Sequence, residues 1–229
     1  MRMWHNSSLM LGHLRMKQNR RGVATTLKKS IVGGIVFALV LAALPACMAA
    51  DSSIYKIEED WEMVINEPDP NSHSPQVTFF TSPCADCDDT YFQLQMNYAA
   101  DEGFSGGGFH VAAVNQGEIV DEERSHTKVA LTTAHDHVRW TNVMALIDQK
   151  LYFAVKSGHC NDWGSFGGPE YLVEMPTESI DLSNYQSQQS LDTLDIGFGG
   201  NRVNSVTLRS VILHYSDGTK ERLPLNQQP

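Results

Sequence analysis

Three carboxylates at alternate positions are the residues of this sequence whose types and spacing come nearest to a catalytic arrangement. Glu58, Asp60 and Glu62 lie in residues 55–66, whose apolar period of two is typical of a half-buried strand. A strand would place all three on one face, where crowding raises the pKa of one carboxyl and leaves an acid beside a nucleophile. Glycoside hydrolysis uses such a pair. The alternative is a solvated acidic strand face with no catalytic role.

Aromatic and polar side chains also meet in residues 157–170. Trp163 and Phe166 could stack on sugar rings, and the neighbouring Asn161 and Asp162 could bond hydroxyl groups or a calcium ion. These four residues are candidate ligand-binding residues. The alternative is a loop that folds back over its own aromatic side chains.

A row of amides is the third candidate. In residues 91–98 Gln93, Gln95 and Asn97 alternate with large apolar residues, so a strand would turn the amides outward together. We expect them to line a polar face for the same ligand, or to be an ordinary exposed face.

Three cysteines follow residue 50, and their odd number leaves one unpaired. We expect Cys160 to pair with Cys84 or Cys87, with a Cys84–Cys87 bridge as the alternative. A zinc site made of these cysteines and His159 is disfavoured, because adjacent residues such as His159 and Cys160 rarely both reach one tetrahedral metal.

The segment around the first two cysteines is acidic. Asp86, Asp88 and Asp89 make calcium the one cofactor that the sequence suggests, although their spacing matches no EF-hand loop. No other cofactor is indicated, and the cofactor requirement stays open.

The first fifty residues have the composition of an export signal. They contain no acidic residue, and two lysines precede an apolar run that ends in small residues. Translation could start at Met1 or at Met16, which gives a more ordinary signal length. Three fates are open: cleavage, lipidation at Cys47, or retention of residues 31–50 as a membrane anchor. Each predicts that residues 51–229 are periplasmic, at the cell surface or extracellular, with membrane contact only through the N-terminal segment.

Export changes the charge of the remaining protein. All 27 acidic residues, but only ten of the 17 basic ones, lie beyond residue 50, so that part has a formal charge of −17 with neutral histidines. A surface this acidic repels nucleic acid and anionic lipid. Nucleic acid is therefore excluded as a partner.

The spacing of strand and turn signals predicts the fold class. About a dozen short segments of strand character alternate with turns, and no convincing amphipathic helix interrupts them. Residues 138–155 predict a central hairpin that turns at Asp148 and Gln149 and is apolar on both faces near the turn. We also expect strands at residues 129–133 and 194–198. The pattern predicts one all-β domain, an antiparallel sandwich or jelly roll over residues 51–229.

Two stretches resemble the concanavalin A-like lectin and glucanase jelly rolls. Residues 140–155 are similar to that family's hairpin of tryptophan, strand, short turn and strand. Residues 194–211 are similar to its closing pair, whose last strand returns to the start of the chain. The resemblance implies a curved sandwich with a concave face and names no ligand. The acid triplet also resembles that of the laminarinase-like glucanases, although Glu59 stands where they have an apolar residue. The chain beyond residue 50 further resembles a type of exported bacterial protein.

These observations favour an exported, non-catalytic β-sandwich that binds a glycan or a cell-surface partner through its loops or its concave face. One alternative is a polysaccharide-degrading enzyme that uses Glu58, Asp60 and Glu62. Another is a structural envelope protein without a small ligand. The lack of a recognisable catalytic motif argues against an enzyme but does not exclude one.

Overall fold

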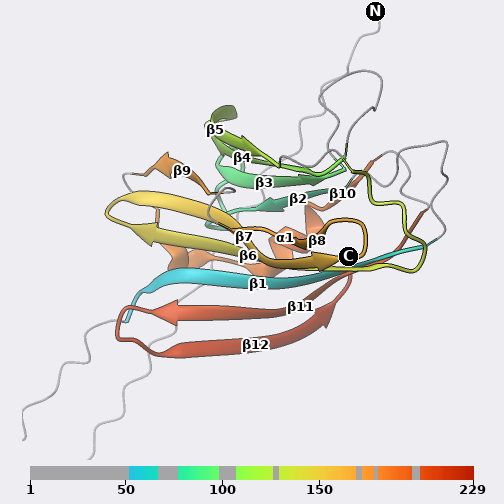
Figure 1. Ribbon diagram of the computed structural model, residues 1–229. Helices are drawn as coiled ribbons and strands as arrows, with labels where there is room; N and C mark the ends of the chain where they lie inside the picture. The colour runs from blue at the N-terminus through green and yellow to red at the C-terminus, as the bar shows by residue number, and fades with distance from the viewer. Residues whose placement is uncertain are drawn as a thin grey trace, which may run out of the picture. The chain divides into compact units, whose positions relative to one another are not determined.

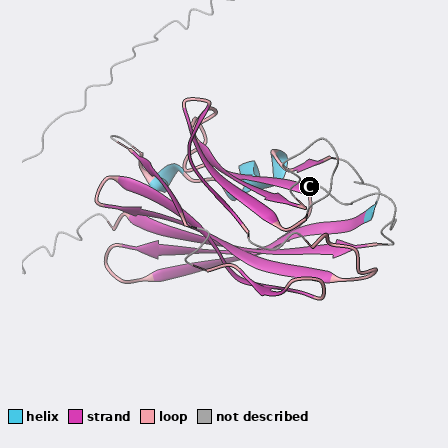
Figure 2. Cartoon of the chain, turned by 45° about the horizontal axis from the view of Figure 1, so that its top comes forward, coloured by secondary structure: helices cyan, strands magenta, loops and turns pink. Residues whose placement is uncertain are grey.

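Two antiparallel sheets packed face to face form the body of the protein (Figures 1 and 2). The computed structural model describes residues 52–66, 77–97, 107–125, 129–168, 172–177, 180–197 and 202–229. The predicted export segment, with Met16, Cys47 and residues 31–50, lies outside the described residues. In the ranges described, no helix is both long and apolar enough to cross a membrane. The predicted antiparallel sandwich is confirmed.

The larger sheet has seven strands in the order β12-β11-β1-β6-β7-β8, with β9 also paired to β7. Strand β1 therefore lies beside β11, far along the chain, which confirms that a late strand returns to the start of the domain. The strands are β1 (Ile54–Ile65), β6 (His137–Ile147), β7 (Lys150–Cys160), β8 (Gly164–Phe166), β9 (Val173–Pro176), β11 (Val203–Tyr215) and β12 (Lys220–Gln227).

The smaller sheet has five strands in the order β10-β2-β3-β4-β5. They are β2 (Val77–Thr81), β3 (Tyr91–Met96), β4 (Phe109–Asn115), β5 (Glu118–Arg124) and β10 (Asp195–Ile196). Between β9 and β10 the chain forms a 3₁₀ turn (Leu182–Asn184) and a short helix, α1 (Ser187–Asp192). Strand β5 was not predicted, because five of its seven residues are charged and its two apolar residues, Ile119 and Val120, are adjacent rather than alternating.

The core lies between the sheets and is rich in aromatic rings. Trp61 and Trp140 stack with their ring centroids 6.3 Å apart, and Phe79 from the other sheet meets both edge-on. Phe92 and Phe153 form a second stacked pair across the layers at 5.0 Å. These rings come from alternate residues of their strands, as period-two burial requires.

The predicted central hairpin is β6–β7. Asp148 and Gln149 both have positive φ, which is the conformation of a two-residue turn whose twist matches that of the strands. One detail differs from expectation. The apolar side chains near the turn that point away from the core are only partly covered, and Ile147 is half exposed. With Tyr152 and Leu172 they border a shallow apolar hollow of about 320 Å³.

Residues 129–133 do not form the expected strand. Their amide groups are taken by side chains: Leu131 N–H donates to Asn97 Oδ1 at 2.7 Å, and Thr132 N–H donates to Asp162 Oδ2 at 2.6 Å. A segment whose N–H groups are satisfied in this way cannot join a strand ladder through them. Of the strand expected at residues 194–198, residues 194–197 are described, and there the strand is Asp195–Ile196, β10, which pairs with β2 rather than with β11.

Candidate functional site

The outward side of the five-stranded sheet is polar across four strands. The register sets Gln95 opposite Thr78 on one side and His110 on the other, and His110 opposite Arg124. The alternate residues of the same strands fill the core, so these side chains point away from it. We call this surface the polar face, and it consists of Thr78, Phe80, Tyr91, Gln93, Gln95, His110, Glu122 and Arg124.

His110 braces the polar face. Its Nδ1 lies 3.0 Å from Gln95 Oε1, and its Nε2 lies 2.8 Å from Glu122 Oε2. Burial lowers the pKa of His110 and outweighs the opposing effect of the Glu122 carboxylate. Glu122 in turn accepts hydrogen bonds from Arg124, and the side chains of both remain almost half exposed. Side chains held in this way present fixed donors and acceptors to a ligand.

At the β2–β3 end the polar face deepens into a hollow of about 340 Å³. We call it the aromatic hollow, and it is lined by Phe80, Ser82, Asp88, Tyr91, Gln189 and Thr193. The rings of Phe80 and Tyr91 meet edge-on, with centroids 5.4 Å apart. Gln189 and Thr193 come from α1 and the residue after it, four positions apart and therefore on one helix face.

One wall atom of the aromatic hollow lacks a partner. Gln189 Oε1 is buried and accepts no hydrogen bond within the described part of the chain. A buried acceptor without a donor carries a desolvation penalty, which a ligand hydroxyl or N–H would remove. Aromatic rings, a carboxylate, an amide and hydroxyls together match a ligand that has an apolar C–H face and a hydroxylated rim.

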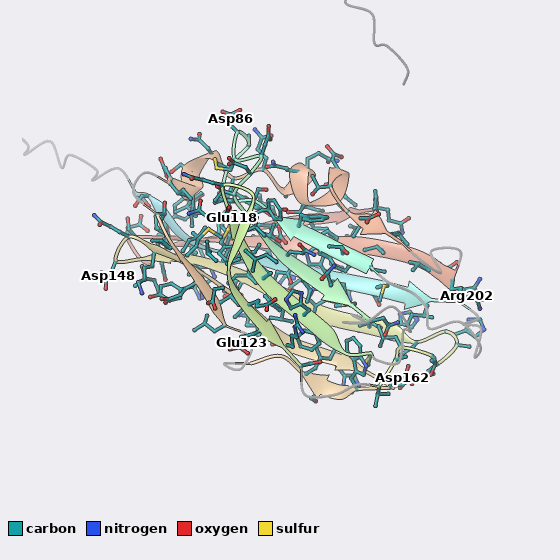
Figure 3. The ribbon with its side chains drawn as sticks, turned by 90° about the horizontal axis from the view of Figure 1, so that it is seen from above. Asp86, Glu118, Glu123, Asp148, Asp162 and Arg202 are labelled. Atoms are coloured by element: carbon teal, nitrogen blue, oxygen red, sulfur yellow. A yellow bond between two sulfur atoms is a disulfide. The ribbon has the colours of Figure 1, made fainter. Side chains whose placement is uncertain are left out.

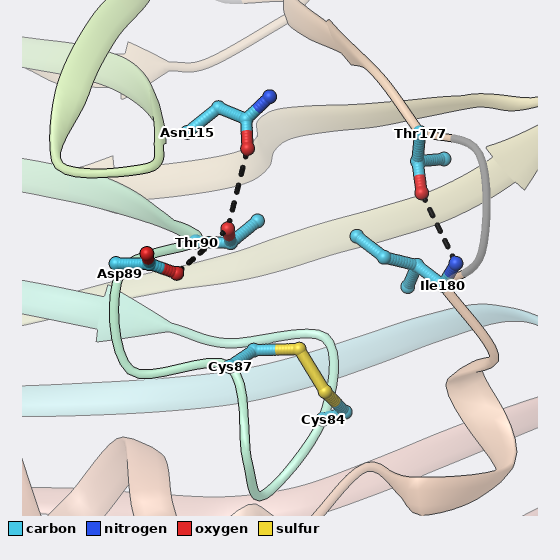
Figure 4. Close-up of a disulfide and its surroundings, with 7 residues drawn as sticks. All are labelled: Cys84, Cys87, Asp89, Thr90, Asn115, Thr177 and Ile180. Atoms are coloured by element: carbon cyan, nitrogen blue, oxygen red, sulfur yellow. Dashed lines mark hydrogen bonds between the residues drawn. A yellow bond between two sulfur atoms is a disulfide. The ribbon is translucent and has the colours of Figure 1, made fainter.

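The β2–β3 loop, which carries Asp88, is closed by a disulfide between Cys84 and Cys87 (Figure 4). The expected pairing of Cys160 with one of them is wrong, and the alternative is confirmed. Figure 3 shows the reason: Asp86, between the bridged cysteines, and Asp162, close to Cys160, lie at separate edges of the body. Cys160 is free and buried, and burial raises the pKa of its thiol to about 11.

The cysteine pairing also removes the zinc set, since a disulfide sulfur is not a thiolate ligand. Across the described ranges no three His, Cys, Asp or Glu side chains converge to hold a metal ion. Asp86 and Asp89 border a polar hollow of about 590 Å³ that also involves Asn115 and Thr177. In Figure 4 Thr90 bridges Asp89 and Asn115 through its hydroxyl, with both oxygen–oxygen distances at 3.3 Å. The calcium suggestion gains no support from this geometry.

The acid triplet lies on the outer face of the seven-stranded sheet, and its three members share that face as expected. Every member is paired. Glu58 contacts Lys56 and Lys156 at 2.8 and 2.9 Å, and Asp60 accepts hydrogen bonds from Thr141 and Ser210. Glu62 contacts the side chains of His137, Arg139 and Arg209.

These partners lower the pKa of Glu58 and Glu62, which disfavours a role for either residue as a general acid. Burial alone would raise the pKa of Glu58, but hydrogen bonds and positive charge from Lys56 and Lys156 prevail and lower it from 4.5 to about 2. For Glu62, burial is likewise outweighed by its His137 and Arg139 hydrogen bonds and by arginine charge, which lower the pKa. A glycosidase acid needs a raised pKa, so the environment of Glu58 and Glu62 does not favour catalysis.

The lowered pKa of Glu58 predicts a pH dependence of stability. A carboxyl with a depressed folded-state pKa contributes its full stability above the unfolded value near 4.5 and loses it as the pH falls toward about 2. We expect Glu58→Gln to flatten the fall in the free energy of unfolding between pH 4.5 and 2. Urea titrations from pH 7 to pH 2 measure it, with Glu118→Gln, at an exposed position, as control. Parallel curves for wild type and Glu58→Gln would contradict it.

The comparisons with known proteins add no family. No protein-family model and no curated protein sequence matches the chain. The crystal structure of the ancestral congerin Con-anc covers 75% of this chain and 91% of its own, at 14% identity and a TM-score of 0.29. A variant of the ancestral congerin Con-anc′ covers 64% and 92%, at 10% identity and a TM-score of 0.27. At these TM-scores the likeness carries no argument about a ligand, and the two sheets described above establish the fold.

The loop aromatics of residues 157–170 have a structural role. Phe166 is buried, so its ring cannot serve as a stacking platform. Trp163 is half-buried, packs against Phe166 and Phe109, and donates its Nε1–H to the Val129 carbonyl at 2.7 Å. The loop folds back over its own aromatic side chains, which is the alternative considered above.

The Asp162 side chain and the Asn161 backbone connect this loop to residues 132–136. Asp162 accepts hydrogen bonds from both amide groups of Thr132 and Thr133 and from the Thr133 hydroxyl. The backbone N–H of Asn161 donates to Asp136 Oδ2 at 2.8 Å. The Asp162 oxygens are therefore occupied within the protein.

Of the predicted amide row, Gln93 and Gln95 lie on the polar face as expected, whereas Asn97 does not. Asn97 has a φ of 55° and is buried at 2% exposure, because the left-handed turn at the end of β3 carries its side chain inward to Leu131. Phe80, Tyr91 and Gln189 were not predicted as site residues. Alternation within β2 and β3 could have placed the first two on an outer face, but no sequence signal linked them to the polar segment that holds Gln189.

Proposed function

We propose that this protein is an exported, non-catalytic carbohydrate-binding β-sandwich of concanavalin A-like jelly-roll type. A sugar ring would sit in the aromatic hollow, and an attached chain would run along the polar face. The observation that supports the proposal most is the lining of the hollow. Two aromatic rings there stand beside the Asp88 carboxylate, the hydroxyls of Ser82 and Thr193, and a buried amide oxygen that has no donor among the described residues.

Each part of the hollow would have a defined role. The C–H face of the ring would pack on Tyr91, as apolar surfaces of amphipathic ligands do on aromatic side chains. Its hydroxyls would donate to Gln189 Oε1 and Asp88 and would exchange hydrogen bonds with Thr193. Gln93, Gln95 and the braced Glu122–Arg124 pair would contact the following sugar unit. Export is supported by the composition of the first fifty residues, and a glycan of an envelope or an extracellular surface is the ligand class proposed.

A glycan array followed by calorimetric titration tests the proposal. We expect Tyr91→Ala to weaken binding of the selected glycan by about tenfold or more, because the stacking surface is lost. Gln189→Ala should weaken it as well, through the lost acceptor. Tyr152→Ala is the matched control, since Tyr152 lies on the outer face of the other sheet.

Two results would contradict the proposal. One is that no glycan binds to folded wild-type protein on the array. The other is that Tyr152→Ala reduces affinity while Tyr91→Ala leaves it unchanged, which would move the site to the seven-stranded sheet.

A further inference from the structure

A carboxylate is buried inside the core of the sandwich. Glu59 lies on the inward face of β1 between Ile57 and Trp61, and only 1% of its surface is exposed. Burying a charged carboxylate is unfavourable unless hydrogen bonds replace its water. The partners of Glu59 therefore show what this residue holds together.

Within the described ranges, five neutral donors surround the carboxylate, and they fall into two groups. Oε2 accepts from the two sheets: Trp61 Nε1 at 3.0 Å, Thr81 Oγ1 at 3.2 Å and Asn142 Nδ2 at 3.4 Å. Among the described residues, Oε1 accepts from the segment that covers this end of the sandwich: Tyr185 OH at 2.6 Å and Ser190 Oγ at 2.7 Å. One side chain thus joins both sheets to the covering segment.

The covering segment, residues 180–193, has apolar anchors as well. Leu182 and Leu191 are buried in the core on either side of Tyr185. Burial and the negative charge of Glu59 raise the pKa of Tyr185 well above its ordinary value, so its hydroxyl stays protonated and donates. Hydrophobic contacts hold the segment against the core but do not depend on direction. The two short hydrogen bonds to one carboxylate oxygen do depend on direction, and they fix the position of the segment.

That position matters for the aromatic hollow. Ser190 points to Glu59, while Gln189, the residue before it, and Thr193 line the hollow. A rotation of α1 that released Ser190 would also move the Gln189 amide away from Phe80 and Tyr91. One face of α1 therefore lines the aromatic hollow, and another face of the same helix carries Ser190, which bonds to Glu59 inside the core.

We propose that the Glu59 carboxylate is an internal clasp that fixes residues 180–193 and thereby acts as a positioning residue for the aromatic hollow. Its consequence for ligand affinity rests on the proposed carbohydrate binding. The clasp itself does not, because it concerns only contacts within the protein.

Hydrogen exchange separates the two parts. The double variant Tyr185→Phe/Ser190→Ala removes both donors to Oε1 and leaves the tyrosine ring and the helix in place. We expect the amides of Tyr185, Thr193 and Leu194, which donate to carbonyl groups of the segment, to exchange about tenfold to a hundredfold faster. Amides of β1 and β6 should keep their rates. Thr81→Val is the matched control, because it removes a sheet-side donor to the same carboxylate, and it should leave the segment's exchange unchanged.

Titration of the glycan selected by wild-type protein provides the second readout. Faster exchange confined to the segment, together with weaker binding, supports the clasp. Unchanged amide exchange rates of the segment in the double variant would overturn the clasp. An increase in exchange rate that is equally large for the amides of β1 and β6 would also overturn it. Faster segment exchange with unaltered affinity overturns the positioning role. If wild-type protein binds no glycan, the proposed function fails alone, and the exchange rates still decide the clasp.

Discussion

Replacement of Glu59 by leucine is expected to lower the free energy of unfolding by about 3–5 kcal/mol. The hydroxyls of Thr81, Tyr185 and Ser190 can turn to other acceptors. The Trp61 Nε1–H and the Asn142 amide cannot, and each is left as a buried donor without an acceptor. A loss of this size is a large share of the roughly 5–15 kcal/mol that stabilises a typical domain.

Urea unfolding monitored by tryptophan fluorescence measures this effect, since Trp61 and Trp140 are buried reporters. Glu59→Gln should cost much less, because its carbonyl can keep the partners of Oε2 while the Tyr185 and Ser190 hydroxyls accept from its amide. Glu123→Leu, at an exposed position of β5, is the surface control. A Glu59→Leu loss below about 1 kcal/mol would show that the buried hydrogen bonds make little net contribution.

Truncation of Trp140 to alanine is the second large effect that we expect, again about 3–5 kcal/mol. Trp140 is 2% exposed, stacks on Trp61 and meets Phe79 at a centroid distance of 4.8 Å. Its Nε1–H also donates to Asn142 Oδ1 at 3.0 Å. The variant therefore opens a cavity between the sheets and leaves an amide oxygen without its donor.

Trp163→Ala is the comparison for this prediction. Trp163 is half-buried at the edge of the core, so we expect a loss of about 1–2 kcal/mol. Urea unfolding followed by far-ultraviolet circular dichroism suits both variants, because it does not depend on the removed tryptophans. Equal losses for Trp140→Ala and Trp163→Ala would contradict the central place that we assign to the Trp61–Trp140 stack.

Local alternation predicted the parts of this protein that depend on neighbouring residues. Strands β1 and β3 and the β6–β7 hairpin follow from the period of two, because a strand with one face in the core repeats its environment at every second residue. The same rule placed Gln93 and Gln95 on an outer face. It also predicted the antiparallel sandwich, since many short alternating segments separated by turns can bury their apolar faces only against another sheet.

Strand β5 and residues 129–133 are two segments that local alternation did not predict correctly. Strand β5 lacks an apolar face because it lies at the sheet edge, and its pairing with β4 gave no hydrophobic signal. Residues 129–133 have strand-like composition, but Asn97 and Asp162 take their amide groups from segments about thirty residues away. Such long-range side-chain partners are absent from any local pattern.

The strand pattern, the class of fold and the export-like composition of the first fifty residues could be inferred without a structure, because each depends on the order of residues along the chain. Three features required the folded structure: Cys84 pairs with Cys87, Glu59 is the centre of a buried network, and Gln189 lies beside Phe80 and Tyr91. Cys84 and Cys87 are only three residues apart, but the choice between this bridge and one to Cys160 depended on where the distant Cys160 lies in the fold. For Glu59 and Gln189 the cause is separation along the chain. The contacts of these two residues join segments up to about 130 residues apart, and their geometry exists only after the two sheets and the covering segment have packed.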